Sequence, residues 1–407
     1  MKNLVFLILP LTLLTACSNS AGTNTNKDSV SSVSDTRPDT GIVTGAQQVD
    51  KYLPLLAGKN VALTINNTSV IDGKLSMDTL LKRGVKIVKG FGPEHGFRGE
   101  ASDGAKISDA TDEKTGVPLI SLYGAKYKPT AEDMKGIDVM IFDIQDVGVR
   151  FYTYLSTLHY IMEACAENNV ELIVLDRPNP NDGYIDGPVR EPDQESFVGK
   201  HAIPILHGLT FGEYAGMING EGWLPGKAKC KLTVIKMENY SHGKPYTLPI
   251  APSPNLNTQQ AVLLYPSLCL FEGTAISQGR GTQHPFTVLG SPELKGKYEF
   301  SFKPVSIPGM SDNPPHKDKI CYGVDLREYD TSVFVESGRI NLAWLKEFYA
   351  AYPNKKAFFS AARFDRLAGT STLRNQIIAG KPEEEIRKSW EPGLGRYKEM
   401  RKKYLLY

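Results

Sequence analysis

Between residues 60 and 237 the sequence alternates short apolar runs with amphipathic segments, and this alternation limits the possible fold more than any other feature. The runs 137–144 (IDVMIFDI) and 170–176 (VELIVLD) are apolar at most positions, as expected of strands that are covered on both faces. Between them, the apolar residues of 150–169 recur at helical spacing. Doubly buried strands separated by helices predict a mostly parallel, Rossmann-like sheet with helices on both sides.

The same reasoning places further strands and helices along the chain. We expect strands at 60–65, 85–91, 117–123, 202–207 and 231–237, and helices at 76–84, 131–135 and 210–221. The alternation ends near residue 245, where a proline-rich stretch begins and the patterns become mixed. The sequence therefore predicts an α/β protein with a Rossmann-like domain over 48–250 and a smaller α+β domain over 251–407.

The N-terminus has the layout of a signal peptide over residues 1–16, with one lysine, an apolar run from Leu4 to Leu14 and a small-residue end. Its apolar run is too short to span a bilayer. The stretch LTAC resembles a bacterial lipobox, in which the cysteine (here Cys17) is lipidated, although an ordinary signal peptide with an incidental cysteine is the alternative. Residues 17–47 are rich in Ser, Thr and Asn and indicate a flexible tether. We expect an exported lipoprotein of the periplasm or cell envelope, held to the membrane by this anchor.

The charge balance argues against a nucleic-acid partner. The chain has 47 Lys and Arg against 45 Asp and Glu, a net charge of +2, whereas nucleic-acid binders concentrate basic residues on one face. Four cysteines remain besides Cys17, widely spaced and without the CxxC pairs of a zinc site. The sequence leaves their disulfide pairing open, and we expect neither a metal nor a cofactor.

Polar residues follow the predicted strands, at the edge where the loops of an open parallel sheet gather around a ligand. The residues are Asn66, Glu94, Asp143, Asp146, Arg150, Asp176, Arg177, Asn179 and His207. A single Asp or Asn in such a loop is more often a turn or cap residue than a catalytic one. The geometry of the sheet, however, would bring the whole set into one cleft.

The loop KGFGPEHGFRGEASDG has the position of a dinucleotide-binding loop without its chemistry. Its third glycine comes one residue late for G-x-G-x-x-G, Pro93 lacks an amide donor, and Glu94 places a carboxylate where phosphate would sit. The residues after the loop show no helical periodicity. The loop instead offers the carboxyl group of Glu94, with His95 and Arg98 nearby, in a turn whose glycines would let a ligand come close.

A carboxylic acid in such a loop suits glycoside hydrolysis, in which one acid protonates the leaving oxygen and a second carboxylate usually acts on water or on the sugar. We predict Glu94 as the acid, with Asp143, Asp146 or Glu272 as candidates for the second role. A metal-dependent hydrolase is less favoured, because the histidines form no H-x-H or H-E-x-x-H pair. A serine nucleophile lacks its G-x-S-x-G elbow.

The second half of the chain contains one dense polar segment, 265–292. Within it Glu272, Ser277, Arg280 and His284 are interleaved with glycines and aromatic residues. Arg280 would suit an anionic substrate group, since a guanidinium can bind a carboxylate through two parallel hydrogen bonds. An interdomain loop with exposed charges is the alternative explanation.

Six motifs together resemble the NamZ-like exo-β-N-acetylmuramidases, and the resemblance covers essentially the whole chain after the tether. They are GPEHGFRG, DxQDVGxRxYTY (143–154), LDRPNP (175–180), LHGLTxGE (206–213), PSPN (252–255) and FEGTxxSxGRGT…PF (271–286). The resemblance implies a glycoside hydrolase of cell-wall turnover that removes N-acetylmuramic acid from the non-reducing ends of peptidoglycan fragments. It also implies a Rossmann-like domain, an auxiliary domain and an active site between them.

Carried over to this sequence, the resemblance implies Glu94 as the catalytic acid. It implies a sugar pocket lined by Arg150, Tyr152, Asn179 and His207, and Arg280 or Arg150 would pair with the lactyl carboxylate of muramic acid. The remaining candidates for substrate contact are Asn66, His95, Arg98, Arg177 and Ser277. Two other functions stay open: a non-catalytic lipoprotein that binds cell-wall sugars, and a metal-dependent amidase or deacetylase.

Overall fold

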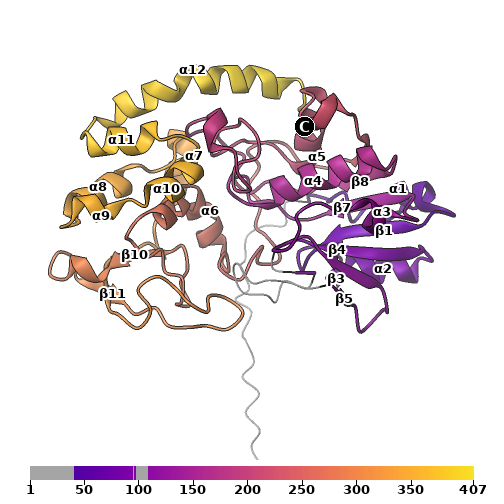
Figure 1. The fold of residues 1–407 in the computed structure, drawn as a ribbon, viewed down its shortest axis with the longest axis horizontal. Helices are drawn as coiled ribbons and strands as arrows, with labels where there is room; N and C mark the ends of the chain where they lie inside the picture. The colour runs from indigo at the N-terminus through magenta and orange to yellow at the C-terminus, as the bar shows by residue number, and fades with distance from the viewer. Residues whose placement is uncertain (1–40, 95, 98–108) are drawn as a thin grey trace, which may run out of the picture. The chain divides into compact units, whose positions relative to one another are not determined.

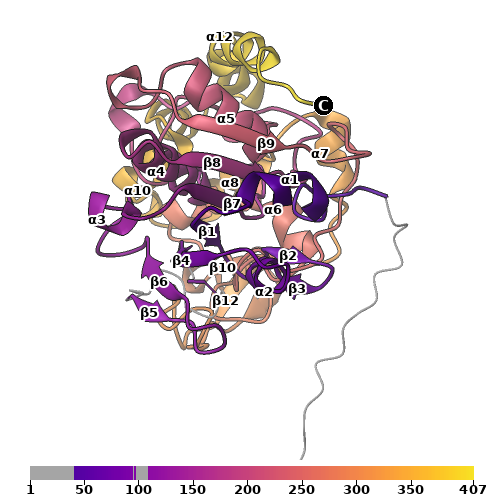
Figure 2. The ribbon, with the colours of Figure 1, turned by 90° about the vertical axis from the view of Figure 1, so that its right-hand side faces the viewer.

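Seven strands form the main sheet, in the order β5-β6-β4-β1-β7-β8-β9 (Figures 1 and 2). Neighbouring strands run parallel except for β5 and β6. The computed structural model describes residues 41–94, 96–97 and 109–407. The strands are β1 (Val61–Ile65), β4 (Ile87–Gly92), β5 (Ala110–Thr111), β6 (Pro118–Ser121), β7 (Val139–Asp143), β8 (Glu171–Leu175) and β9 (Lys231–Ile235). The mostly parallel, Rossmann-like sheet predicted from the sequence is confirmed.

Both faces of this sheet are covered, which explains why its strands are apolar throughout. Because successive strand residues point to opposite faces, Leu63 and Ile141 join the core beneath α1 (Val49–Leu56) and α2 (Ser76–Lys82). Their neighbours Ala62 and Met140 join the core beneath α4 (Tyr154–Glu167) and α5 (Phe211–Gly220). A short helix, α3 (Ala131–Met134), precedes β7, and a small hairpin, β2 (Val70–Ile71) and β3 (Lys74–Leu75), follows β1.

The strand predicted at 202–207 is wrong. This segment is irregular and makes only isolated bridges, from Leu206 to Val149 and to Asp186. Ile203, Ile205 and Leu206 are fully buried, so the apolar pattern reflects burial in the core rather than membership of the sheet. The sheet position beside β8 is taken by β9 instead.

The second part of the chain is a smaller α+β region, as predicted. Its antiparallel sheet has the order β10-β12-β11, formed by β10 (Val288–Ser291), β11 (Phe300–Phe302) and β12 (Cys321–Asp325). Its helices are α6 (Gln259–Leu268), α7 (Ser332–Ser337), α8 (Ala343–Ala351), α9 (Lys355–Phe358), α10 (Ala361–Ala368), α11 (Thr372–Ile378) and α12 (Glu383–Lys402). All described residues belong to one compact unit, and the domain boundary near residue 250 stays a prediction.

The last helix and the residues after it return to the first half of the chain (Figure 1). Tyr397 of α12 donates a hydrogen bond to the carbonyl of His207 at 2.6 Å. Beyond the helix, the Tyr407 hydroxyl donates to Asp176 at 2.8 Å. Asp176 directly follows β8, so the C-terminal segment is bonded to the edge of the main sheet where its parallel strands end.

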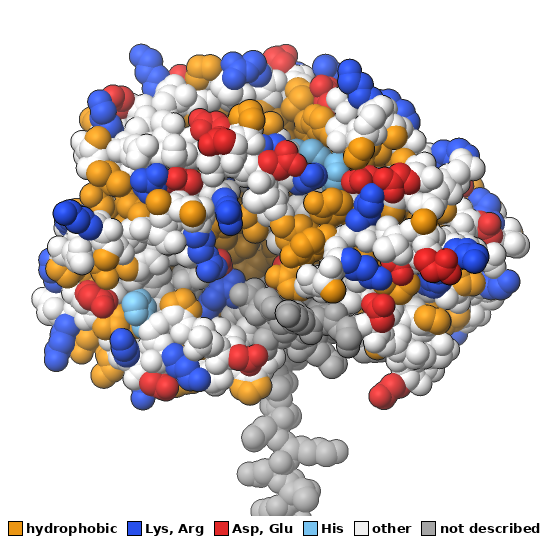
Figure 3. Space-filling model, in the orientation of Figure 1, with side chains coloured by type: hydrophobic (Ala, Val, Ile, Leu, Met, Phe, Trp, Pro, Cys, Tyr) orange, Lys and Arg blue, Asp and Glu red, His pale blue; other side chains and the backbone are white. Residues whose placement is uncertain are grey.

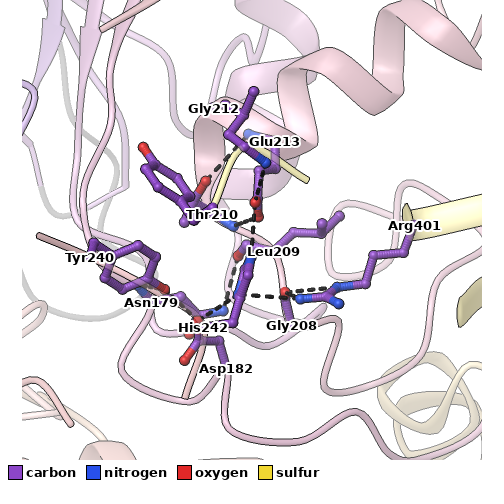
Figure 4. A network of polar contacts seen from close by, with 12 residues as sticks. Asn179, Asp182, Gly208, Leu209, Thr210, Gly212, Glu213, Tyr240, His242 and Arg401 are labelled. Carbon is purple, nitrogen blue, oxygen red and sulfur yellow. Dashed lines mark hydrogen bonds and ion pairs between the residues drawn. The ribbon is translucent and has the colours of Figure 1, made fainter. Parts of the chain in front are cut away.

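A polar network centred on His242 holds the same region together (Figure 4). His242 lies 2.7 Å from Asp182 through Nδ1 and 2.8 Å from Glu213 through Nε2. Glu213 also accepts a hydrogen bond from the backbone N–H of Leu406, and Arg401 donates to the carbonyl of Gly208. The network therefore joins the first turn of α5 to the C-terminal segment.

The structure bears on the cysteines and on possible membrane-spanning helices. Cys165, Cys230, Cys269 and Cys321 are buried free thiols. In the portion of the chain that the structure describes, no helix combines the length and the apolar character needed to cross a bilayer. The predicted signal peptide and Cys17 lie outside the described residues.

Candidate active site

The main sheet has a topological switch point between β1 and β7. From β1 the chain moves outward through β4 to β6, and it then returns to the other side of β1 for β7, β8 and β9. Ligands of such sheets bind outside the carboxyl ends of the strands at this point. The loops that follow β1 and β7 meet here, since the backbone N–H of Gln145 donates to the Thr68 hydroxyl at 3.0 Å.

Glu94 follows β4 at the same edge and is held from two directions. Its carboxylate oxygen Oε2 accepts a hydrogen bond from the Thr153 hydroxyl at 2.7 Å, and its carbonyl accepts one from the Tyr154 hydroxyl at 3.2 Å. Asn66, in the loop after β1, is buried, and its Oδ1 accepts a hydrogen bond from the Thr68 hydroxyl at 2.6 Å. The half-buried acid is thus positioned by Thr153, at the end of the loop after β7, and by Tyr154, the first residue of α4.

Gly90 and Gly92 of this loop allow neighbouring residues of the protein to pack closely. A Cβ at Gly90 would lie 2.7 Å from Leu119 and 3.1 Å from the Phe97 ring, and one at Gly92 would lie 3.0 Å from the Phe97 backbone. The loop therefore folds back over the end of β4 and buries Phe97 there. His95 and Arg98 lie outside the described residues.

Glu94 lines a cavity of about 310 Å³ whose walls come from both halves of the chain. Figure 3 shows a hollow in one face of the molecule, with Lys and Arg side chains along one wall and hydrophobic side chains inside it. The residues that line the cavity are Glu94, Tyr123, Phe151, Tyr152, Thr153, Tyr154, Phe197, Val198, Ser253, Asn255, Leu256, Tyr265, Cys269, Glu272, Arg280, Phe286, Arg363 and Leu367.

Aromatic rings make up much of the cavity wall. Tyr152 packs against Tyr154 with ring centroids 4.7 Å apart, and Tyr265 packs against Phe286 at 4.8 Å. The Tyr152 hydroxyl donates to the carbonyl of Pro252 at 2.9 Å, which ties the PSPN motif to the cavity. Burial raises the pKa of Tyr152, Tyr154 and Tyr265 above the usual value for a phenol, so all three are neutral.

The wall contributed by the second half of the chain carries three charges. Glu272, in the short helix Cys269–Gly273, accepts from Arg280 at 2.7 Å through Oε1 and from Arg363 at 2.8 Å through Oε2. Burial alone would raise the pKa of Glu272, but the two guanidinium groups outweigh burial and hold that pKa below its usual value. Glu272 is therefore an ionised carboxylate whose two oxygens are both occupied.

Two of the predicted site residues form a buried ion pair away from this cavity. Arg177 Nε donates to Asp143 Oδ1 at 2.6 Å, and Arg177 Nη2 donates to the carbonyl of Val70 at 3.0 Å. Asp143 is fully buried, and neither residue is among those that line the cavity. The pair connects the end of β7 to the loop after β8.

Four more predicted residues have structural partners in the fold. Asn179 donates to the carbonyl of Leu209 at 2.9 Å and lies against Gly148, where a Cβ would come within 2.1 Å of the Asn179 amide oxygen. His207 accepts from the backbone N–H of Leu209, while its Nε2 lies 3.4 Å from Asp146. The remaining two are Ser277, which accepts from the N–H of Gly279, and Arg150, which donates to three backbone carbonyls.

The comparisons with known proteins show the family of this chain. A family model described as the N-terminal part of the exo-β-N-acetylmuramidase NamZ matches residues 61–260, and its C-terminal counterpart matches 263–407. The chain belongs to the NamZ family.

Relatives of this NamZ-family chain match it over most of its length. It is 41% identical over 375 residues to the peptidoglycan β-N-acetylmuramidase NamZ of Bacillus subtilis strain 168, covering 88% of this chain and 89% of that protein. A crystal structure of a DUF1343 family protein from Bacteroides fragilis NCTC 9343 superposes with a TM-score of 0.83 at 44% identity, covering 90% of this chain and 99% of the other. A second such protein from that organism gives a TM-score of 0.77 at 31% identity, covering 91% and 100%.

Several residues of the cavity were not predicted from the sequence. Thr153, Ser253 and Asn255 lie within quoted NamZ-like motifs, so the motifs themselves could have pointed to them. Arg363 lies in α10, outside every motif, and meets Glu272 only through the tertiary fold. Among residues 41–94, 96–97 and 109–407, no group of three or more His, Cys, Asp and Glu side chains is arranged to hold a metal ion.

Proposed function

We propose that this chain is an exo-acting β-N-acetylmuramidase that releases N-acetylmuramic acid from the non-reducing ends of peptidoglycan fragments, with Glu94 as general acid. Membership of the NamZ family and the name of the Bacillus relative support the reaction. The observation that carries the proposal is the half-buried carboxyl group of Glu94 in the cavity at the switch point of the sheet.

The hydrogen bond from Thr153 suits an acid at this position. Because Glu94 Oε2 accepts from the Thr153 hydroxyl, the proton of the neutral acid would reside on Oε1. Among the described residues, Thr153 is the only hydrogen-bond partner of the Glu94 carboxyl group. Oε1 can then give its proton to the glycosidic oxygen as the bond from that oxygen to the anomeric carbon breaks. Water adds its oxygen to the anomeric carbon, and the proton that the water loses restores the neutral acid.

Glu272 is poorly suited to act as the second carboxylate. Both of its oxygens accept hydrogen bonds from arginines, and the two guanidinium groups hold its pKa low, so it is a weak base. Its two ion pairs favour a different role, in which Glu272 holds the guanidinium groups of Arg280 and Arg363 in place on the cavity wall.

The size of the cavity supports action at a chain end. About 310 Å³ lies at the lower end of the range for small-molecule sites, which suits a single sugar rather than several in a row.

The test of the acid compares two leaving groups. Glu94→Gln keeps the shape of the side chain but removes its proton, and we expect kcat/KM on a muramoyl disaccharide to fall by about 10²- to 10⁴-fold. On a dinitrophenyl muramide the loss should be much smaller, because that leaving group departs without protonation. Kinetics on both substrates check the prediction.

The matched control is Glu132→Gln, an exposed glutamate of α3, which should leave both rates unchanged. Equal losses on the two substrates would show that Glu94 is not the acid. A wild-type protein that binds the disaccharide and leaves it intact would instead indicate a binding protein, and activity abolished by a chelator would indicate a metal-dependent hydrolase.

We also propose that the protein is an exported lipoprotein anchored through Cys17. The lipobox-like LTAC sequence and the polar stretch that follows it support this location. Membrane fractionation checks it: the wild-type chain should sediment with membranes, and a Cys17→Ala chain that still does so would contradict the anchor.

A further inference from the structure

Three charged side chains on the cavity wall form an arrangement that the proposed reaction does not itself require. Arg280 and Arg363 contribute two positive charges and Glu272 one negative charge, so the cluster carries an excess positive charge. Such an excess beside a sugar-sized cavity favours a substrate with an anionic group. N-acetylmuramic acid has one, the carboxylate of its lactyl ether.

The two arginines differ in how open they are. The side chain of Arg280 is 12% exposed, and its guanidinium lies 5.1 Å from the centre of the Phe286 ring, so it is largely enclosed. The side chain of Arg363 is 61% exposed. Among the described residues, the only hydrogen bond of the Arg363 guanidinium is the one from Nη2 to Glu272, so most of its five N–H donors make no hydrogen bond within the described part of the chain.

Arg363 also lies at a junction between two cavities. It lines the cavity of Glu94 and a neighbouring cavity of about 450 Å³, which shares Glu272 and Arg280 with the first. A substituent that points away from a sugar ring in the first cavity toward the second would therefore pass Arg363. In the orientation that the inference requires, the lactyl ether is this substituent.

The contact with Glu272 prepares Arg363 for binding. A free arginine side chain loses rotamer entropy when it is immobilised, and a hydrogen bond to a buried carboxylate supplies part of that ordering in advance. Glu272 is 11% exposed and is fixed on its other oxygen by Arg280. Its low pKa keeps this contact ionised in mildly acidic solution.

We propose that Arg363 is the specificity residue that binds the lactyl carboxylate of the muramic acid, with Glu272 and Arg280 as positioning residues. The inference rests on the proposed muramidase activity and adds to it the group that distinguishes this sugar from N-acetylglucosamine. Arg150 cannot take this role, because it is buried in the interior, where its Nη1 and Nη2 donate to backbone carbonyls, and it lines neither cavity.

The test uses a pair of substrates that differ only in charge: nitrophenyl N-acetylmuramide and the same compound with its lactyl carboxylate converted to a methylamide. For the wild-type protein we expect kcat/KM to favour the free acid by about 10- to 100-fold, as for a charge-assisted hydrogen-bonded pair. Arg363→Gln should lower the rate on the acid to near that on the amide and leave the amide rate within about threefold. Arg363→Lys, which keeps the charge but not the planar fork, should fall between them.

Arg366→Gln is the matched control, since Arg366 is an exposed arginine on the same helix, and it should keep the wild-type ratio. A wild-type acid-to-amide ratio in Arg363→Gln overturns the inference. So does a ratio that is lost in Arg280→Gln but retained in Arg363→Gln, with both proteins shown to be folded by circular dichroism.

A binding measurement separates this inference from the proposed reaction. Calorimetry on the Glu94→Gln protein, with and without Arg363→Gln, compares N-acetylmuramic acid with its methylamide. If binding discriminates through Arg363 while the wild-type protein hydrolyses no muramide, the inference stands and the proposed reaction fails. If the Glu94→Gln protein binds the acid and the amide equally, or binds neither, the inference is overturned even if the wild-type protein hydrolyses muramides.

Discussion

Arg150 and Arg363 show how differently two arginines of one protein can be used. The side chain of Arg150 is buried, and its guanidinium donates to the carbonyls of Pro188, Ile203 and Leu367 at 2.7 to 2.8 Å. Burial, reinforced by the nearby charge of Arg190, lowers the pKa of Arg150 to about 9. It joins the loop after β7 to an irregular segment and to the end of α10, which is a structural task.

This difference gives a prediction for Arg150→Gln. Removing the guanidinium leaves three buried carbonyls without their donors, and we expect the free energy of unfolding to fall by about 3 to 5 kcal/mol. Urea unfolding measures this loss, while Arg366→Gln should change stability by less than about 0.5 kcal/mol. The acid-to-amide ratio of the folded Arg150→Gln protein should equal that of the wild type. A stable variant that lost this ratio would restore Arg150 as the lactyl partner.

The role of Glu94 could be predicted from the sequence, whereas the role of Arg363 could not. The chemistry of Glu94 is local, because a proline, several glycines and an acid follow a strand within a few residues. Arg363 was identified through its contact with Glu272, which is 91 positions earlier in the chain. Its own helix shows only an ordinary amphipathic pattern. Asp143 and Arg177 were expected at a ligand site but are paired with each other. Such a tertiary pairing could not be predicted from the sequence.

At the scale of elements, apolar runs in the sequence predicted which segments are buried, but not which of the buried segments join the sheet. The strands β1, β7 and β8 fall where their doubly apolar runs were found, since both faces of the sheet are covered. The segment 202–207 has a similar apolar run but no place in the sheet, because burial against helices produces the same pattern. The order of the strands follows from tertiary packing and was not predicted from the sequence. It is known from the structure.

The C-terminal segment depends on an ionisable network, which makes its attachment sensitive to pH. Burial alone would lower the pKa of His242, but the hydrogen bonds to Asp182 and Glu213 outweigh burial and raise that pKa to about 9. Tyr240, which donates to Asp182, and Arg401, whose Nη2 lies 3.2 Å from His242 Nδ1, complete the surroundings of the ring. The folded protein therefore holds this proton more tightly than the unfolded chain does.

Because the folded-state pKa of His242 is raised, its contribution to stability is fully present below about pH 6.5 and is lost as the pH rises through about 9. The shift corresponds to at most about 3 kcal/mol. We expect the unfolding midpoint of the wild type to fall between pH 7 and pH 9.5, and His242→Gln to flatten that slope. His284→Gln, at an exposed histidine, should keep it. A wild-type slope in His242→Gln would show that other groups cause the pH dependence.

At the scale of the whole molecule, the cavity lined by Glu94 and the hydrophobic core are both shared between the halves of the chain. Glu94 comes from the first half and Arg363 from the second, and they line one cavity. One hydrophobic core extends from the main sheet to α12. Across the halves, the buried Arg387 donates to Asp186 at 2.8 Å, and Asp186 also accepts from the backbone N–H of Ile340.

Shared burial of this kind predicts that the described part of the protein unfolds as one unit. Separating the halves would expose apolar core and break the buried Arg387–Asp186 pair, so neither half should be stable when the other has unfolded. Calorimetry should show a single transition, and N-acetylmuramic acid should raise its midpoint as a whole, because binding to a site built from both halves stabilises both. A chain ending at residue 260 should show no cooperative transition. Two transitions, with only one responding to the sugar, would instead mean that the halves are independent and would support a domain boundary near residue 250.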